Sequence, residues 1–465
     1  MQTQRWKLSL SRTLATAALT LRLCAAAQGT SKYEVIHNFT GGADGAGNTG
    51  VIVDSAGNLF AASKEKVLYS FKDNGTDGTA PYAGLLFDTD GNLYGTTALG
   101  GTPGSGCKNQ GCGTVFRLAP GTKGTWTEKV LYSFQDNGTD GFEPVANLIF
   151  DTSGNLYGTT PAGGAHDVGS VFELTPGAGG MWSETVLHSF AGYPTDGEYP
   201  YAGPIFDGNG NLYGTTYEGS VGAGTVFQLT PAAGTWTGTV LYTFGTNGKH
   251  DGGQPYAGLI FDASGNLYST LSIAGDRGGG AVGSVFQLTP GAEGSWTEKI
   301  LYGCGSRGCP DQGGDAHGNV IFGPGGKIYS TTSVGGAYLK PCGGVGCGTV
   351  FQLTPKSGGK WTEEVIHSFG KGKDGELPQA GVIRGADGRL YGTTLDGGAY
   401  GGGTVFQLTP GANGTWSEKV LHSFGKGKDG ASPYAGLILD AAGNLYGTTS
   451  QGGAHNSGTV FEIIP

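Results

Sequence analysis

The chain has 465 residues, of which 94 are glycine, and its formal net charge is −10. High glycine content without a Gly-X-Y period excludes collagen, and the recurring Phe, Leu, Val and Trp positions argue against a disordered chain. The acidic balance makes nucleic acid and anionic membrane surfaces poor partners, because both carry negative charge. We therefore expect a globular protein whose partners are cations, neutral polymers or basic proteins.

Residues 1–27 predict a secretory signal peptide. Basic residues precede an apolar stretch over 14–27, which ends in three alanines. Cys24 leaves a lipoprotein open as an alternative, but Leu23 precedes it where a small residue is needed. No later segment approaches the ~20 apolar residues that span a bilayer. We expect residues 28–465 to form one monomeric domain, secreted or periplasmic, without insertion into a membrane.

The rest of the chain repeats one phrase. Gly-Asn-Leu-Tyr-Gly-Thr-Thr occurs at 91–97, 154–160, 210–216 and 443–449, with degraded copies between them. Three more segments recur around it: an apolar run ending in Asp, Gly-Thr-Val-Phe-Gln-Leu-Thr-Pro, and Trp-x-Glu-x-Val-Leu-Tyr/His-Ser-Phe. Each is rich in β-branched and aromatic residues and is bounded by turn residues, as strands are. Four antiparallel strands per repeat predict a blade of a β-propeller.

The chain ends predict how the ring closes. Residues 33–39 resemble an isolated outer strand, whereas the chain finishes on a third strand, 458–464, whose own outer strand is missing. Pairing the two removes a free sheet edge. The first repeat lacks the Gly-Thr-Val-Phe segment and should have three strands. We expect an all-β, eight-bladed propeller with a three-stranded blade 1 and a last blade closed by residues 33–39. The expected bounds of blades 1 to 8 are 50–71, 84–134, 147–190, 203–244, 258–304, 318–369, 381–424 and 436–465.

Six cysteines follow the signal segment and form three copies of one spacing. In an exported protein, an even number at regular spacing predicts disulfides. Zinc binding is the weaker alternative, since no histidine or second pair lies at zinc-finger spacing. Local pairing is the simplest connectivity, and it joins Cys107 with Cys112, Cys304 with Cys309, and Cys342 with Cys347.

The loops between blades share one face with the longest insertions, and variable loops on one face usually carry function. These loops contain an Asp-Gly, at Asp77, Asp140, Asp196, Asp251, Asp374 and Asp429. Several end in Pro-Tyr, at Tyr82, Tyr201, Tyr256 and Tyr434. One interpretation is structural, with each Asp capping its turn and each Tyr packing between blades. The other is an acidic ring with aromatic platforms at the channel mouth, which would bind a cation, a sugar or a peptide.

One repeat departs from this pattern and supplies the candidate catalytic residues. In blade 6, Arg307, Asp311, Asp315 and His317 replace the usual Asp-Gly and Pro-Tyr. A reaction needs distinct acid, base or nucleophile roles, so a cluster unique to one blade is where an enzyme would place them. Sequence drift is the alternative explanation. The chain has no Gly-x-Ser-x-Gly, metal or phosphate-loop motif, and we expect no metal and no cofactor.

The repeated segments resemble a known family. Gly-Asn-Leu-Tyr-Gly-Thr-Thr, Gly-Gly-Ala, Gly-Thr-Val-Phe-Gln-Leu-Thr-Pro and Val-Leu-His-Ser-Phe are similar to the GloVer tandem-repeat family of exported bacterial proteins, over residues 33–465. More distantly, the strand pattern resembles NHL and streptogramin-lyase-like propellers, which is a likeness of fold only. The resemblance implies export but no reaction. Family members often carry a C-terminal surface anchor, whereas this chain ends at Ile464-Pro465.

Together these features favour an exported binding or scaffolding module for an extracellular glycan or protein. An exported lyase or hydrolase that acts on polysaccharide is the first alternative. A structural component of the cell envelope is the second.

Overall fold

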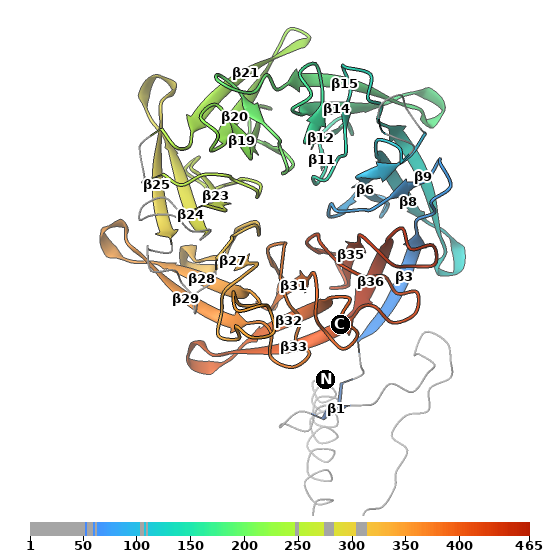
Figure 1. Ribbon diagram of the computed structural model, residues 1–465, viewed down its shortest axis with the longest axis vertical. Helices are drawn as coiled ribbons and strands as arrows, with labels where there is room; N and C mark the ends of the chain where they lie inside the picture. Colours follow the sequence, from blue (N-terminus) through green and yellow to red (C-terminus); the bar gives the residue numbers. More distant parts are fainter. Residues whose placement is uncertain are drawn as a thin grey trace, which may run out of the picture. The chain divides into compact units, whose positions relative to one another are not determined.

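The computed structural model describes residues 63–465 except 103–106, 108–109, 247–250, 274–282 and 304–313, together with a strand pair before them. The chain divides into two units, Met1–Ala62 and Ser63–Pro465. In the first unit, β1 (Ile52–Val53) pairs with β2 (Leu59–Phe60) in an antiparallel two-stranded sheet. The second unit is a ring of blades, seven four-stranded antiparallel sheets in the described residues (Figure 1).

Each blade runs from the central axis to the outside in four strands, and we number the blades I to VII along the chain. The innermost strands have two residues each: β5 (Leu86–Phe87), β11 (Ile149–Phe150), β17 (Ile205–Phe206), β22 (Ile260–Phe261), β26 (Ile321–Phe322), β30 (Ile383–Arg384) and β34 (Ile438–Leu439). The second strands are β6 (Leu93–Thr97), β12 (Leu156–Thr160), β18 (Leu212–Thr216), β23 (Leu267–Leu271), β27 (Ile328–Thr332), β31 (Leu390–Thr394) and β35 (Leu445–Thr449).

The two outer positions of each blade hold longer strands. The third strands are β8 (Thr114–Pro120), β14 (Ser170–Pro176), β20 (Thr225–Ala232), β24 (Ser284–Pro290), β28 (Thr349–Pro355), β32 (Thr404–Pro410) and β36 (Thr459–Ile464). The outermost strands are β9 (Trp126–Ser133), β15 (Trp182–Ser189), β21 (Thr235–Thr243), β25 (Trp296–Gly303), β29 (Trp361–Ser368), β33 (Trp416–Ser423) and β3 (Lys64–Ser70).

The prediction of eight blades is wrong, and the order of strands in the last sheet explains why. Strand β3 pairs with β36, from Lys64 opposite Ile464 to Ser70 opposite Thr459. The repeat predicted to form a three-stranded blade 1 therefore supplies the outer strand of blade VII, and its other strands form the separate β1–β2 pair. Since that repeat lacks a third strand, β3 has no partner within it, whereas β36 has a free edge. The predicted closing strand, residues 33–39, lies outside the described residues.

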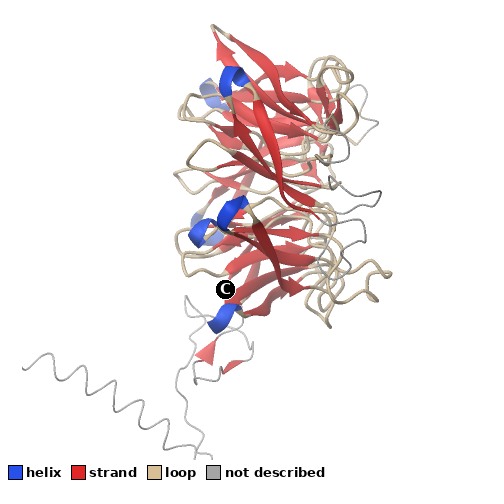
Figure 2. Ribbon diagram, turned by 90° about the vertical axis from the view of Figure 1, so that its left-hand side faces the viewer, coloured by secondary structure: helices blue, strands red, loops and turns tan. Residues whose placement is uncertain are grey.

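The two faces of the ring differ in their connections (Figure 2). The turn face carries the tight turns between first and second and between third and outer strands. It holds the short 3-10 helices η1 (Thr122–Gly124), η2 (Ala178–Gly180), η3 (Ala292–Gly294), η4 (Pro324–Gly326), η5 (Ser357–Gly359) and η6 (Ala412–Gly414). The opposite loop face carries the longer loops. On it lie the short strand pairs β4 (Gly78–Thr79) with β7 (Leu99–Gly100), β10 (Gly141–Phe142) with β13 (Ala162–Gly163), and β16 (Gly197–Glu198) with β19 (Glu218–Gly219).

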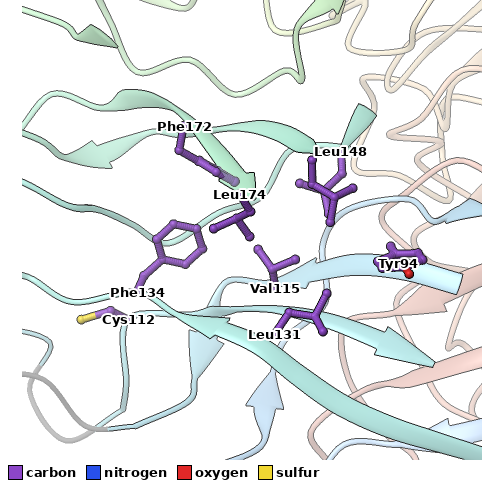
Figure 3. Packing of buried hydrophobic residues seen from close by; sticks show 9 residues of the cluster. Tyr94, Cys112, Val115, Leu131, Phe134, Leu148, Phe172 and Leu174 are labelled. Carbon is purple, nitrogen blue, oxygen red and sulfur yellow. The ribbon is translucent and has the colours of Figure 1, made fainter. Parts of the chain in front are cut away.

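The hydrophobic core lies between neighbouring blades. All five residues of every second strand are buried. Each of these strands has a strand on either side within its sheet, and a neighbouring blade packs against each face of that sheet. Figure 3 shows one cluster, in which Phe134 of blade I meets Phe172 of blade II edge to face at 5.1 Å. Each blade thus buries its apolar faces only against its neighbours. No helix in the described residues has the length and apolar character to cross a membrane.

Candidate functional site

A cavity of about 400 Å³ lies on the ring axis and is lined by residues from all seven blades. Its walls are the inner strands, and its rim is formed by the loops that lead into them from the loop face. This is the position where the sequence predicts a ligand site.

One residue from each blade forms the rim of the cavity, and we call this set the mouth ring. It comprises Tyr82, Val145, Tyr201, Tyr256, His317, Gln379 and Tyr434. Two positions before each of them, the backbone adopts a left-handed conformation with φ between 55° and 59°, at Ala80, Glu143, Tyr199, Gln254, Asp315, Leu377 and Ser432. This repeated kink turns each loop inward and brings all four predicted tyrosines to the cavity.

Threonine hydrogen bonds tie the mouth ring to the rest of the fold. In each blade, the fourth residue of the second strand donates its hydroxyl to a carbonyl at the start of the next blade's inner segment. Thr448 of the last blade donates to Ala83 of the first at 2.9 Å, which closes the circle. The equivalent donors are Thr96, Thr159, Thr215, Thr270, Thr331 and Thr393, at 2.9 to 3.4 Å. The acceptor directly follows a mouth-ring residue, so the rim is held by buried bonds.

The aromatic side chains of the mouth ring form two groups. In the first, the Tyr256 ring stacks on Tyr201 at 4.9 Å and 21° and lies 4.7 Å from the His317 ring on the next blade. In the second, Tyr82 and Tyr434 meet edge to face at 5.5 Å. A hydrogen bond of 3.0 Å between the hydroxyls of Tyr256 and Tyr434 links the groups. The mouth is therefore an ordered aromatic rim.

His317 of the mouth ring lies beside a carboxylate. Its Nε2 lies 3.1 Å from Oδ1 of Asp315, and its Nδ1 lies 3.2 Å from Oε1 of Gln379. Burial lowers the pKa of His317, but the hydrogen bond and negative charge of Asp315, together with Gln379, raise it above its usual value overall. Both neighbours accept hydrogen bonds, which favours the imidazolium form because a neutral ring donates from only one nitrogen.

The six predicted aspartates lie elsewhere on the loop face. Each faces a Tyr or His of the preceding outer strand; for example, Tyr69 donates to Asp77 at 2.7 Å and Tyr132 to Asp140 at 2.9 Å. The other pairs are Asp196 with His188, Asp251 with Tyr242, Asp374 with His367, and Asp429 with His422, at 3.0 to 3.4 Å. None of the six lines the cavity. The structure thus separates the aspartates from the tyrosines, with which the sequence grouped them.

The structure describes only part of the predicted cysteine pairs and of the predicted catalytic cluster, which belongs to blade V in the observed numbering. Cys107 is bonded to Cys112, and Cys342 to Cys347. Both sulfurs that approach Glu376 belong to the second disulfide, so this group does not offer thiolate ligands to a metal. The third predicted pair, Cys304 and Cys309, and the candidates Arg307 and Asp311 lie outside the described residues.

Sequence reasoning missed Gln379 of the mouth ring and, deeper in the cavity wall, the two polar residues Asn147 and Asn319. Both asparagines occupy the position that is glycine in the other five blades, two residues after the mouth ring. An alignment of the repeats with one another would have revealed them, because asparagine replaces glycine at this position in only these two repeats.

Three comparisons relate the chain to known proteins. Residues 61–282, 180–340 and 315–465 match the model of the Gloeobacter/Verrucomicrobia repeat. No relative among curated proteins matches the sequence. A periplasmic gluconolactonase of Pseudomonas aeruginosa is 15% identical with a TM-score of 0.45, covering 82% of this chain and 98% of its own. An ulvan lyase from a new family of polysaccharide lyases is 11% identical with a TM-score of 0.49, covering 85% and 95%. A luciferin-regenerating enzyme is 11% identical with a TM-score of 0.40, covering 69% and 91%. At these values, none of the three structures bears on what this chain binds.

Proposed function

The chain belongs to the Gloeobacter/Verrucomicrobia repeat family, and we propose that it is an exported module that binds an extracellular glycan at the mouth ring. The observation that carries this proposal is the convergence of four tyrosines from four blades on one cavity, with His317 and Gln379 between them. Aromatic faces pack against the C–H faces of sugar rings, and the polar groups among them bind hydroxyls.

The size and shape of the site favour a glycan over a folded protein. A cavity of about 400 Å³ falls within the ~300 to 1,000 Å³ typical of small-molecule sites. A stable protein interface needs roughly 800 Å² on each partner, most of it on a broad surface. Among the described residues, the large apolar side chains exposed on the loop face, such as Tyr193, Val221 and Tyr400, come from different loops, so no single element presents a continuous apolar surface. A sugar unit inserted between the tyrosines suits the geometry better.

Mutation of one stacking residue tests the proposal. A glycan array screened with the protein lacking residues 1–27 identifies a ligand, whose dissociation constant is then measured by calorimetry. The Tyr201→Ala variant should bind it about 5- to 150-fold more weakly, since one aromatic stacking contact contributes ~1 to 3 kcal/mol. Tyr201 is half-buried and its ring packs on Tyr256 and Tyr217 at the loop face, outside the core clusters between blades, so the fold should survive.

The control for this experiment is Asn211→Ala on the turn face. Asn211 donates to Asp207 at 2.7 Å within its hairpin and takes no part in the cavity. This variant should lose some stability and keep its affinity. If Tyr201→Ala binds like the wild type while Asn211→Ala loses the glycan, the ligand site is not at the mouth ring.

The pairing of Asp315 with His317 favours a second candidate function, that of a polysaccharide lyase or hydrolase. An imidazole oriented by a carboxylate can transfer a proton to or from a bound substrate. At the mouth ring the pair occurs in one blade, and the His317 ring packs on the ring of Tyr256, whose hydroxyl bonds to that of Tyr434. For an enzyme, His317→Ala should abolish cleavage of the glycan while most of the affinity remains. Intact glycan after prolonged incubation with the wild-type protein would reject this second candidate.

A further inference from the structure

The polar groups of the cavity wall are unusual for an acidic protein. In the described part of the chain, no Asp, Glu, Lys or Arg lines the cavity, although the whole chain carries a net charge of −10. The polar side chains there belong to four tyrosines, two asparagines, one histidine and one glutamine. The tyrosine hydroxyls can both donate and accept, but the described lining holds no carboxylate that could accept bonds from the hydroxyls of a ligand.

The two asparagines are fixed in one orientation by the backbone of the preceding blade. Oδ1 of Asn147 accepts from the N–H of Gly84 at 2.7 Å, and Oδ1 of Asn319 accepts from the N–H of Gly258 at 2.9 Å. The oxygen of each amide is thereby engaged. Because a glycine N–H can only donate, the atom that faces it must be Oδ1 and not Nδ2. Each Nδ2 has no partner within the described residues, and both side chains are exposed to the cavity. Each presents two N–H donors to whatever enters.

The two asparagines line the same cavity from different sides of the ring. Asn147 belongs to blade II and Asn319 to blade V, with two blades between them on one side and three on the other. They therefore approach the axis from nearly opposite walls, one layer below the mouth ring. Above Asn319 in the same blade lies His317, whose ring is held between Asp315 and Gln379.

We propose that this cavity recognises the carboxylate of an acidic sugar, with the Nδ2 groups of Asn147 and Asn319 donating to its oxygens. This inference rests on the proposed function, that the mouth ring binds a glycan. A carboxylate accepts about four hydrogen bonds and donates none, which matches the two asparagine Nδ2 groups that have no partner within the described residues. The hydroxyl of a neutral sugar can also accept from these donors, but a hydrogen bond to a charged carboxylate is roughly twice as strong. The tyrosines above would stack on the ring of the same sugar.

The test compares two ligands that differ only in the carboxylate. Oligomers of a hexuronic acid are used beside the same oligomers after chemical reduction of each carboxyl group to an alcohol, and binding is measured by calorimetry. The wild-type protein should bind the acidic oligomers at least about tenfold more tightly, as expected for hydrogen bonds to a charged group.

Isosteric variants then assign the preference to the two amides. Asn147→Asp and Asn319→Asp keep the oxygen that accepts from glycine but replace two donors with a negative charge. Each should weaken binding of the acidic oligomer at least about tenfold and leave binding of the reduced oligomer nearly unchanged. Asn209→Asp, at an exposed turn on the opposite face, adds the same charge and should change neither.

The outcomes distinguish failure of this inference from failure of the proposed function. Equal or tighter binding of the reduced oligomer, weakened by Tyr201→Ala, overturns the carboxylate preference but supports a glycan site at the mouth ring. Tight binding of the acidic oligomer that Asn147→Asp and Asn319→Asp leave intact also overturns the inference. Binding of either oligomer that is insensitive to Tyr201→Ala, or no binding of any glycan, overturns both.

Discussion

Truncation before and after β3 should distinguish a dispensable N-terminal segment from the strand that closes the ring. Strand β3 (Lys64–Ser70) is joined to blade VII by its ladder with β36, and Phe71 follows it into the core between blades VII and I. A protein that begins at Ser63 keeps this strand. A protein that begins at Lys72 loses it and exposes the edge of β36.

The cost of the longer truncation is large compared with the stability of a folded domain. Phe71 is fully buried and meets Phe116 edge to face at 5.1 Å, and Leu68 is 8% exposed. Loss of a buried Phe costs about 3 to 5 kcal/mol and loss of a buried Leu about 2 to 5 kcal/mol. Tyr69 also donates to the buried Asp77 at 2.7 Å. The total, ~5 to 10 kcal/mol before the lost ladder, is similar to the ~5 to 15 kcal/mol that stabilises a whole domain.

Urea denaturation followed by circular dichroism and size-exclusion chromatography measures the difference. The protein that begins at Ser63 should unfold cooperatively at the same midpoint as the protein lacking only residues 1–27. The protein that begins at Lys72 should be aggregated or unfolded without urea, because an open edge strand recruits other chains. As a matched point variant, Phe71→Ala should lose about as much stability as Phe134→Ala, the equivalent change in blade I. Equal midpoints for the two truncated proteins would refute this account of ring closure.

Two further predictions concern repeated features of the blades. Burial, with neighbouring carboxylates in most cases, raises the pKa of six outer-strand glutamates from 4.5 to about 7 or 8: Glu65, Glu128, Glu184, Glu298, Glu363 and Glu418. Because the folded-state pKa exceeds the unfolded one, the contribution of these glutamates to the free energy of unfolding is fully present below about pH 4.5. It is lost as pH rises through 7 to 8. The melting temperature should therefore fall between pH 5 and 9, less steeply in Glu184→Gln, and a flat or rising profile would contradict this. Gly158→Ala places a Cβ 2.6 Å from the ring of Phe172 and should cost about 1 to 3 kcal/mol, measured by urea denaturation; unchanged stability would show that the ring moves aside.

Sequence alone determined the features that depend on local patterns. Repeated β-branched segments between glycine-rich turns predicted an all-β propeller and the family, since strands and hairpins are specified by neighbouring residues. Spacing within one loop was enough to predict the pairs Cys107–Cys112 and Cys342–Cys347. The repeated Pro-Tyr also indicated the loop face as the place of the tyrosines.

Tertiary structure alone decided the features that depend on pairing between distant segments. The number of blades follows from β3 meeting β36 across the whole chain. Two N-terminal segments, residues 33–39 and 64–70, offered an outer strand for that edge, and their sequences alone did not choose between them. The left-handed kink before each mouth-ring residue sends Tyr256 to the axis, while the outer strand holds Asp251 away from it, although the two are five residues apart. Asn147 and Asn319 line one cavity only because the ring places blades II and V on opposite sides of its axis. The hydrogen-bonding residues and the hydrophobic pattern of one repeat carry no information about which residues line the opposite wall of the cavity.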